Sequence, residues 1–196
     1  MPRVSKEQTD RNRAAIEQAS TRLFKERGFN GVSVADLMGA AGLTHGGFYG
    51  HFSSKDELAA IACSQAFSQA ADRWQTRIKN KTDAQSALHA ILDPYLTKRM
   101  ARNMGNSCPA ATLSVDVARE APDKPVREAY QAGTEQLINI LTALSSAADP
   151  AEQRKQALVQ WSTMVGVMML ASATDGNPLA DELLSAVREH LMGDDA

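Results

Sequence analysis

The chain has 196 residues with 21 basic and 23 acidic side chains, and apolar residues make up 43% of it. These proportions are those of a globular protein and exclude a disordered, collagen-like or disulfide-dense chain. The longest nearly uncharged apolar run, residues 164–173, is about half as long as a membrane span, and no signal-peptide segment opens the sequence. With only two cysteines, the chain is expected to be cytoplasmic and to have no membrane segment.

Charge is distributed unevenly along the chain. Residues 1–55, which we call the head, hold eight basic and five acidic residues, whereas residues 56–196, which we call the body, carry a net charge of −5. A basic segment joined to an acidic one favours a head that meets an anionic partner. Ordinary scatter of surface charge gives the same modest difference, so charge alone leaves both interpretations open.

Three helices are predicted in the head. The first carries an apolar stripe at helical spacing and ends at Gly28, a residue that favours the left-handed conformation of a helix cap. Ser33 and Thr44 are side chains of the type that cap helix N-termini, and Gly42 stops the helix that lies between them. The predicted spans are 9–27, 34–41 and 45–51.

The body is predicted to contain six further helices. Ser54 and Glu57 have the spacing of a capping box, and Asp123 and Asp149 are expected to cap two later helices. Pro94 lies inside the second of the six and predicts a kink, because proline removes one backbone hydrogen bond. The predicted spans are 54–79, 82–103, 110–120, 124–147, 150–174 and 178–192.

No segment alternates as a strand does, so the predicted fold is all-α with about nine helices. A helix, a short helix, a tight turn and a second short helix in the head are typical of a helix-turn-helix module, with a helical bundle as the body. The last helix of the head contains adjacent Gly46 and Gly47, which each weaken a helix by roughly 1 kcal/mol. Close approach to another surface is the usual reason for such glycines. Phe48 and Phe52 are expected in the core of the head.

Two stretches carry a resemblance to a known family. One is Arg27-Gly-Phe-Asn-Gly-Val-Ser-Val-Ala-Asp-Leu, and the other runs from Ala41 as Ala-Gly-Leu-Thr-His-Gly-Gly-Phe-Tyr-Gly-His-Phe-Ser-Ser-Lys-Asp-Glu-Leu. Together they resemble the N-terminal domain of the TetR/AcrR family of bacterial transcriptional regulators, and the likeness is dense over residues 11–62. The resemblance implies a homodimeric regulator, most often a repressor, that binds a palindromic operator in double-stranded DNA and answers a small-molecule effector.

The same resemblance implies a DNA-contacting set in the head. Some members would contact phosphate groups at the starts of helices, and others would contact base edges at the tip of the last helix. The glycines would let the backbone of that helix approach the DNA closely. The set is Ser33, Thr44, His45, Gly46, Gly47, Tyr49, His51 and Lys55.

Some of these residues have a structural alternative. Tyr49 could pack at the rim of the core, and His51 could form a hydrogen bond within the head. Arg11 and Arg13 are expected on an N-terminal arm that either contacts DNA or is simply solvated.

The last two long helices are the candidates for a dimer interface, because paired heads would span successive major grooves. The alternative is that their apolar faces pack only inside the monomer. The expected interface residues are Leu158, Val165, Met169, Leu179, Leu183, Leu184, Val187 and Leu191.

An effector site is expected inside the body. Methionine adapts to varied ligand shapes, and helical bundles hold small molecules between facing helices. An ordinary core shows the same methionine stripe. The candidate lining residues are Phe67, Trp74, Tyr95, Met100, Met104, Trp161, Met164 and Met168.

Cys108 lies at the start of a predicted helix, where the positive end of the helix dipole lowers the pKa of a thiol. Lys98, Arg99 and Arg102 shortly before it are expected to add positive charge. The surrounding run resembles an electrophile- and oxidant-sensing branch of the family related to NemR. The hypothesis is that modification of Cys108 releases DNA, and the alternative is a small buried packing residue, the role expected of Cys63.

Two other classes of function remain open. The body could serve as an adaptor that binds another protein, or Cys108 could belong to a small thiol enzyme. The sequence contains no metal-ligand spacing and no phosphate-binding loop, so we expect no enzyme activity, no cofactor and no metal ion.

Overall fold

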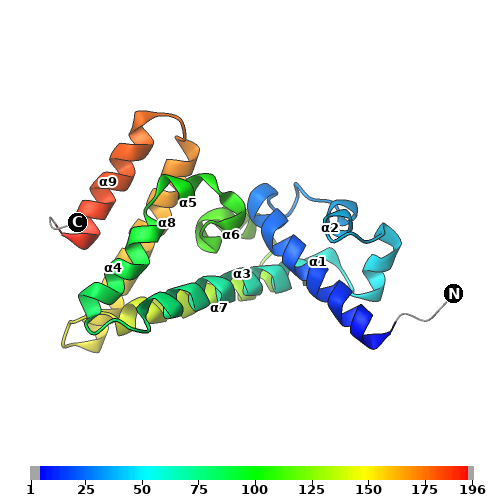
Figure 1. Cartoon of the computed structure of the whole chain (residues 1–196), viewed down its shortest axis with the longest axis horizontal. Helices are drawn as coiled ribbons and strands as arrows, with labels where there is room; N and C mark the ends of the chain where they lie inside the picture. The colour runs from blue at the N-terminus through cyan, green and yellow to red at the C-terminus, as the bar shows by residue number, and fades with distance from the viewer. Residues whose placement is uncertain (1–4, 194–196) are drawn as a thin grey trace.

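The computed structural model describes residues 5–193, and this part of the chain forms nine α-helices and two short 3₁₀ helices with no strand (Figure 1). The all-α prediction is confirmed. No helix in this range is both long and apolar enough to cross a membrane. Arg3, one of the basic residues counted in the head, lies outside the described residues, as do residues 194–196. The elements are α1 (Lys6–Arg27), α2 (Val34–Ala40), η1 (His45–Gly50), α3 (Lys55–Ile78), α4 (Ala84–Tyr95), α5 (Lys98–Arg102), η2 (Met104–Asn106), α6 (Pro109–Arg119), α7 (Pro125–Ala143), α8 (Pro150–Ala173) and α9 (Pro178–Met192).

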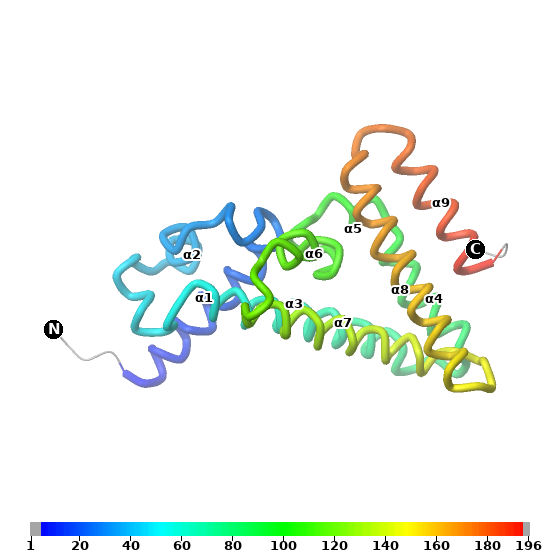
Figure 2. Tube along the Cα trace, turned by 180° about the vertical axis from the view of Figure 1, so that it is seen from behind, coloured from blue at the N-terminus to red at the C-terminus, as the bar shows by residue number. Residues whose placement is uncertain are grey.

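One long helix joins the head to the body. Helices α1 and α2 gather with η1 at one end of the molecule, and α3 leaves this group to run beside α7 (Figure 1). Helices α4, α8 and α9 form the far end, and α6 lies between the two groups against α1 and α3 (Figure 2). Helices α3 and α6 of the body therefore contact the head directly through α1.

The head has a small aromatic core. Phe48 is completely buried, and its ring centroid lies 5.6 Å from that of Phe52. Phe24 and Phe29 form an edge-to-face pair with centroids 5.4 Å apart, a geometry that aromatic rings favour. The predicted core positions of Phe48 and Phe52 are confirmed.

Side-chain caps fix where several helices begin. Helix α1 starts earlier than predicted because Ser5 caps it. The capping box expected from Ser54 and Glu57 is divided between two serines. Ser54 accepts a hydrogen bond from the Glu57 backbone at 3.0 Å, whereas the Glu57 carboxylate accepts from the backbone of Ser53 at 2.7 Å.

The single helix predicted over 82–103 was wrong, because Pro94 ends it instead of kinking it. Helix α4 stops at Tyr95, one residue after the proline. Thr97 then caps a separate helix, α5, by accepting from the Met100 backbone at 3.1 Å. A proline that weakens the backbone ladder and a cap three residues later together favour two helices over one bent helix.

Two other predicted elements differ in the structure. The last element of the head, η1, is a 3₁₀ helix in place of an α-helix, and Thr44 makes no side-chain cap to it. Three glycines among its six residues remove most of the α-helical preference. Helix α7 has Lys124 at its N-cap instead of Asp123, and it ends four residues earlier than predicted.

Helices α3 and α7 pack closely because a glycine of α7 faces an aromatic ring of α3. A Cβ atom at Gly133 would lie 2.2 Å from Cγ of Phe67. The Phe67 ring is fully buried and also packs edge-to-face on Tyr130, with centroids 5.3 Å apart. Phe67 is therefore fixed in a helix–helix contact.

We expect Gly133→Ala to destabilise the fold by about 1–3 kcal/mol, because the added methyl group overpacks the contact with Phe67. Gly39→Ala is the matched control. A Cβ at that helical position meets no atom within 4 Å, so the gain in helix propensity is unopposed. Urea unfolding measures both free energies, and equal stability of the two variants would contradict the contact.

Candidate nucleic-acid interface and body cavities

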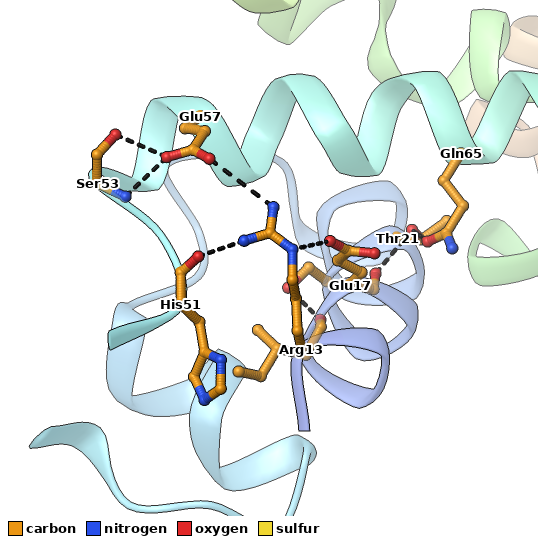
Figure 3. A network of polar contacts seen from close by, with 9 residues as sticks. Arg13, Glu17, Thr21, His51, Ser53, Glu57 and Gln65 are labelled. Atoms are coloured by element: carbon orange, nitrogen blue, oxygen red, sulfur yellow. Dashed lines mark hydrogen bonds and ion pairs between the residues drawn. The ribbon is translucent and has the colours of Figure 1, made fainter. Parts of the chain in front are cut away.

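Arg13 is the hub of a polar network that holds the head together (Figure 3). Its guanidinium donates to the backbone carbonyl of His51, pairs with Glu17 at 2.9 Å and lies 3.8 Å from Glu57. It also sits 4.4 Å above the centroid of the Phe52 ring, within the range of a cation–π contact. The expected N-terminal arm is in fact part of α1, and Arg13 is engaged inside the head.

The network extends along α3 on both sides of Arg13. The Glu57 carboxylate accepts hydrogen bonds from Ser53, which hold the pKa of Glu57 below its usual value. Further along α1, the hydroxyl of Thr21 donates to the side chain of Gln65 at 2.7 Å (Figure 3). Helix α1 is thus fastened to α3 at two levels, which fixes the position of η1 relative to α3.

The outer face of η1 is open. Tyr49 has 72% of its surface exposed, although its ring edge packs on buried Phe48. A Cβ atom at Gly46 or Gly50 would meet nothing within 4 Å. Contacts within the chain therefore do not require glycine at either position. The absence of a side chain leaves room for another molecule to approach the backbone there.

Thr44 and His45 are exposed at the start of η1, whereas His51 and Lys55 are half-buried. The backbone carbonyl of His51 is engaged by Arg13, but its side chain makes no hydrogen bond among residues 5–193. In the same range Lys55 forms no ion pair, whereas Arg11 is neutralised by a carboxylate of α1 at 2.6 Å. Of Arg11 and Lys55, only Lys55 has a positive charge that no ion pair in this range balances.

Ser33 differs from the other predicted contacts. Its hydroxyl donates to the Asp36 carboxylate at 2.5 Å, and its backbone N–H donates to the same group at 2.8 Å. These hydrogen bonds hold the pKa of Asp36 below its usual value. Both donors that a phosphate would use are therefore already engaged in a complete capping box.

Most of the predicted effector-binding residues form closed core. Trp74 packs edge-to-face on Tyr95 and on Trp161, with centroids 6.3 and 5.9 Å apart. These rings, with Phe67 and Met164, are buried and line none of the cavities described here, so their assignment to an effector pocket stays a prediction. Met100 packs against the same core.

Met104 and Met168 do line a cavity, which lies between α5, α6 and α8 and has a volume of about 380 Å³. Met169 and several small residues complete its wall, and an Arg102–Asp175 ion pair of 2.6 Å stands at its edge. The lining is mainly apolar, with a few hydroxyl groups. A small apolar molecule fits this composition.

Cys108 has a raised pKa, so the predicted lowering was wrong. Only 2% of the residue is exposed, and burial raises the pKa of its thiol despite the Tyr95 hydroxyl, the backbone N–H groups of α6 and Lys25 nearby. The Tyr95 hydroxyl forms no hydrogen bond of ordinary geometry, so it stabilises the thiolate of Cys108 only weakly. Two of the expected cations, Lys98 and Arg102, are paired with carboxylates elsewhere.

The predicted dimer surface is only partly free. Leu158 and Leu179 are exposed, whereas Leu184 is 7% exposed and packs inside the monomer, so its contribution to an interface stays a prediction. Val165, Leu183, Val187 and Leu191 are half-buried against the core, and Met169 lines the cavity described above. Sequence periodicity missed Val159 and Leu170, which are 55% and 54% exposed along one stripe of α8.

Lys25 is a buried residue that sequence reasoning did not single out. It lies near the end of α1 with 5% of its surface exposed, and burial, helped by Arg73, lowers its pKa to about 8. No hydrogen bond or ion pair to its side chain occurs among residues 5–193. A lysine in a helix ordinarily points to solvent, so no local signal in the sequence could have revealed this burial.

Comparison with known proteins identifies the head. Residues 16–61 match the sequence model of bacterial regulatory proteins of the tetR family. These residues are therefore similar to the domain that this model describes. The TetC protein of transposon Tn10 from Escherichia coli is 36% identical over 74 residues, which cover 38% of this chain and 37% of that protein. The transcriptional regulator TtgR of Pseudomonas putida is 41% identical over 58 residues, covering 30% and 28%.

The aligned segments span about a third of the length of these relatives. The relatives named above are a TetC protein and a transcriptional regulator, and neither name is that of an enzyme. The match to the sequence model is confined to residues 16–61, so most of the body is interpreted from its own geometry.

Solved structures extend the likeness to the whole fold. Reduced NemR from Escherichia coli superposes with a TM-score of 0.75 at 18% identity, covering 91% of this chain and 95% of that one. A tetR-family regulator from Agrobacterium tumefaciens gives a TM-score of 0.76 at 21% identity, covering 93% and 98%. At these identities the similarity shows a shared fold.

We expect Cys108 to react slowly with a thiol reagent in the native protein. The thiolate is the reactive form, and each unit by which the pKa rises reduces the thiolate fraction about tenfold. The colour reaction of a disulfide reagent at pH 8, with Cys63→Ser as background, measures the rate. Denatured protein is the control, and equally fast reaction of native and denatured protein would show that the thiol is accessible.

Proposed function

We propose that this protein is a homodimeric, effector-responsive transcriptional repressor that binds double-stranded DNA through the head, residues 1–55, and holds its effector and its dimer contact in the body, residues 56–196. The observation that carries the proposal is the open face of η1, where an exposed tyrosine stands between glycines that have no packing role. The tetR-family match over the same elements supports it.

In this proposal η1 enters the major groove and presents Thr44 and His45 at its tip. Gly46 and Gly47 let the backbone approach the DNA, since a Cβ at the latter would meet only the end of a methionine side chain at 3.4 Å. The positively charged side chain of Lys55 and the Tyr49 hydroxyl are assigned to phosphates.

The remaining two contacts have a narrower role. Ser33 reaches a phosphate only if its donors leave Asp36, so we assign it a secondary contribution. His51 is assigned a phosphate contact through its side chain, because its carbonyl is occupied by Arg13.

The dimer contact is assigned to the open stripe of α8. Val159 and Leu170 are large exposed apolar residues, and Gly166 lies between them at helical spacing. A Cβ at Gly166 would meet nothing within the monomer, so a second helix can approach closely there. Leu158 of α8 and Leu179 of α9 are further large apolar residues that are exposed in the monomer.

The effector is assigned to the cavity of about 380 Å³ between α5, α6 and α8. This cavity has the composition of a small-molecule site and borders α6, which contacts the head helix α1. Release of DNA by modification of Cys108, the mechanism of an electrophile-sensing branch, is the second candidate for regulation. The burial of Cys108 makes noncovalent binding the better supported of the two.

Tyr49→Ala and Lys55→Ala should weaken DNA binding without changing thermal stability. Each removes a surface group and leaves the core of the head intact. Loss of the Lys55 charge should reduce the slope of log affinity against log salt by about one per head. Fluorescence titration of a duplex from upstream of the coding sequence, against a scrambled duplex, measures this at several salt concentrations.

Lys79→Ala is the control for the DNA titration, because it removes an exposed charge at the far end of α3. If the wild type bound both duplexes equally weakly with no salt dependence, the head would not be a DNA reader and the adaptor function would take precedence. Repeating the titration with small apolar compounds tests the cavity, and the expected effector lowers affinity for the specific duplex.

Leu170→Glu should convert the dimer to monomer at concentrations where the wild type is paired. Because a two-fold interface contains the same residue from both chains, the substitution buries two glutamate charges, and their desolvation disfavours the dimer. Val115→Glu is the matched control, because Val115 is an exposed apolar residue of α6 outside the stripe. Sedimentation equilibrium distinguishes the two, and a dimer that survives Leu170→Glu would place the interface elsewhere.

A further inference from the structure

The junction between the head and the body contains a second cavity, of about 390 Å³. Helix α1 supplies one wall, and the rest comes from the end of α2, from Gln69 of α3 and from η2. This cavity is separate from the proposed effector cavity, with which it shares no lining residue. Its walls therefore join the element that orients the head to two elements of the body.

The polar lining of this cavity is positive and rich in hydrogen-bond donors. Lys25 and Arg22 contribute two cations, and Gln18, Gln69 and Asn106 contribute amide groups. The lining contains no carboxylate. Arg22 is paired with Glu26 at 3.3 Å on an exposed edge, so its charge is partly balanced.

The charge of Lys25 has no such balance. The residue is 5% exposed, and no ion pair or side-chain hydrogen bond to it occurs among residues 5–193. In this range, the buried side-chain atoms that lack a hydrogen-bond partner are those of Tyr95 and Thr134, so the ammonium group of Lys25 is not closed off and faces the cavity that it lines. A positive charge facing a cavity with no carboxylate in its lining favours a bound anion. An anion in the adjoining cavity would supply the missing acceptor.

We propose that this junction cavity is a binding site for a small oxyanion, a carboxylate or a tetrahedral phosphate-like group, with Lys25 as its central ligand and Gln69 as a hydrogen-bond donor. The site does not depend on DNA binding. An anion held there would bridge α1 to α3 and η2, and so would stiffen the junction across which the head must move.

Proton uptake provides a direct test of the proposal. The groups that act on Lys25 are Arg73 of α3, which disfavours its charge, and Cys108 of α6 and Glu26 of α1, which favour it. With a pKa of about 8, Lys25 is about half protonated at pH 8. A bound anion favours the charged form and raises that pKa, so binding at pH 8 should take up as much as about half a proton.

The experiment is isothermal titration of the DNA-free full chain with sulfate and, separately, with acetate, at constant ionic strength. Both probes are fully ionised at pH 8, so any proton taken up comes to the protein. Buffers of different ionisation enthalpy give the number of protons. Preference for sulfate would identify a tetrahedral ligand, and preference for acetate would identify a carboxylate.

Three variants make the result specific to Lys25. Lys25→Met should weaken binding roughly tenfold or more, since a hydrogen bond to a charged group is lost. Lys25→Arg should keep binding but lose proton uptake, because arginine stays charged at pH 8. Lys79→Met, at an exposed lysine, should behave as the wild type.

The proposal is overturned if neither probe binds, if binding takes up no proton, or if Lys25→Met binds as tightly as the wild type. Should Lys25→Met fail to fold, the comparison of Lys25→Arg with the wild type still decides. These outcomes are independent of the operator titration, so failure here would leave the proposed regulatory function intact.

Discussion

The geometry of the head depends on one guanidinium group. The last element of the head, η1, has three glycines among its six residues and so has little helical preference of its own. Arg13 compensates by joining a carbonyl at the end of η1, carboxylates of α1 and α3, and the face of Phe52. These contacts fix the orientation of η1, whose outer face is exposed to solvent.

The body is tied to the head by contacts at the ends of its helices. Lys124, at the start of α7, pairs with Asp56 in the first turn of α3. Arg127 satisfies the last carbonyls of α6 at 2.6–2.9 Å, and the Tyr130 hydroxyl donates to the first turn of the same helix at 3.1 Å. Helix α7 therefore holds both ends of α6, the helix that lies against α1.

Local features could be predicted from the sequence, and features set by distant partners could not. Helix class, most boundaries and the burial of Phe48 follow from periodicity and capping within a few residues. The role of Arg13 depends on a carbonyl 38 residues away, so local reasoning placed it on an arm. Cys108 shows the same limit, because its position at a helix start suggested a low pKa, whereas the packing of distant helices around it raises that pKa. Lys25 is buried for a similarly remote reason.

The position of the proposed effector cavity has a consequence for how readily an effector could enter it. Its rim includes Ala173, which continues the stripe of α8 that contains Gly166 and Leu170. A partner chain docked along this stripe would cover part of the opening. Separated chains would then admit an effector more readily than paired ones, and a cell holding few copies of the protein would respond at a lower dose than a cell holding many. The effector concentration needed for a response would then depend on how many copies of the protein the cell contains.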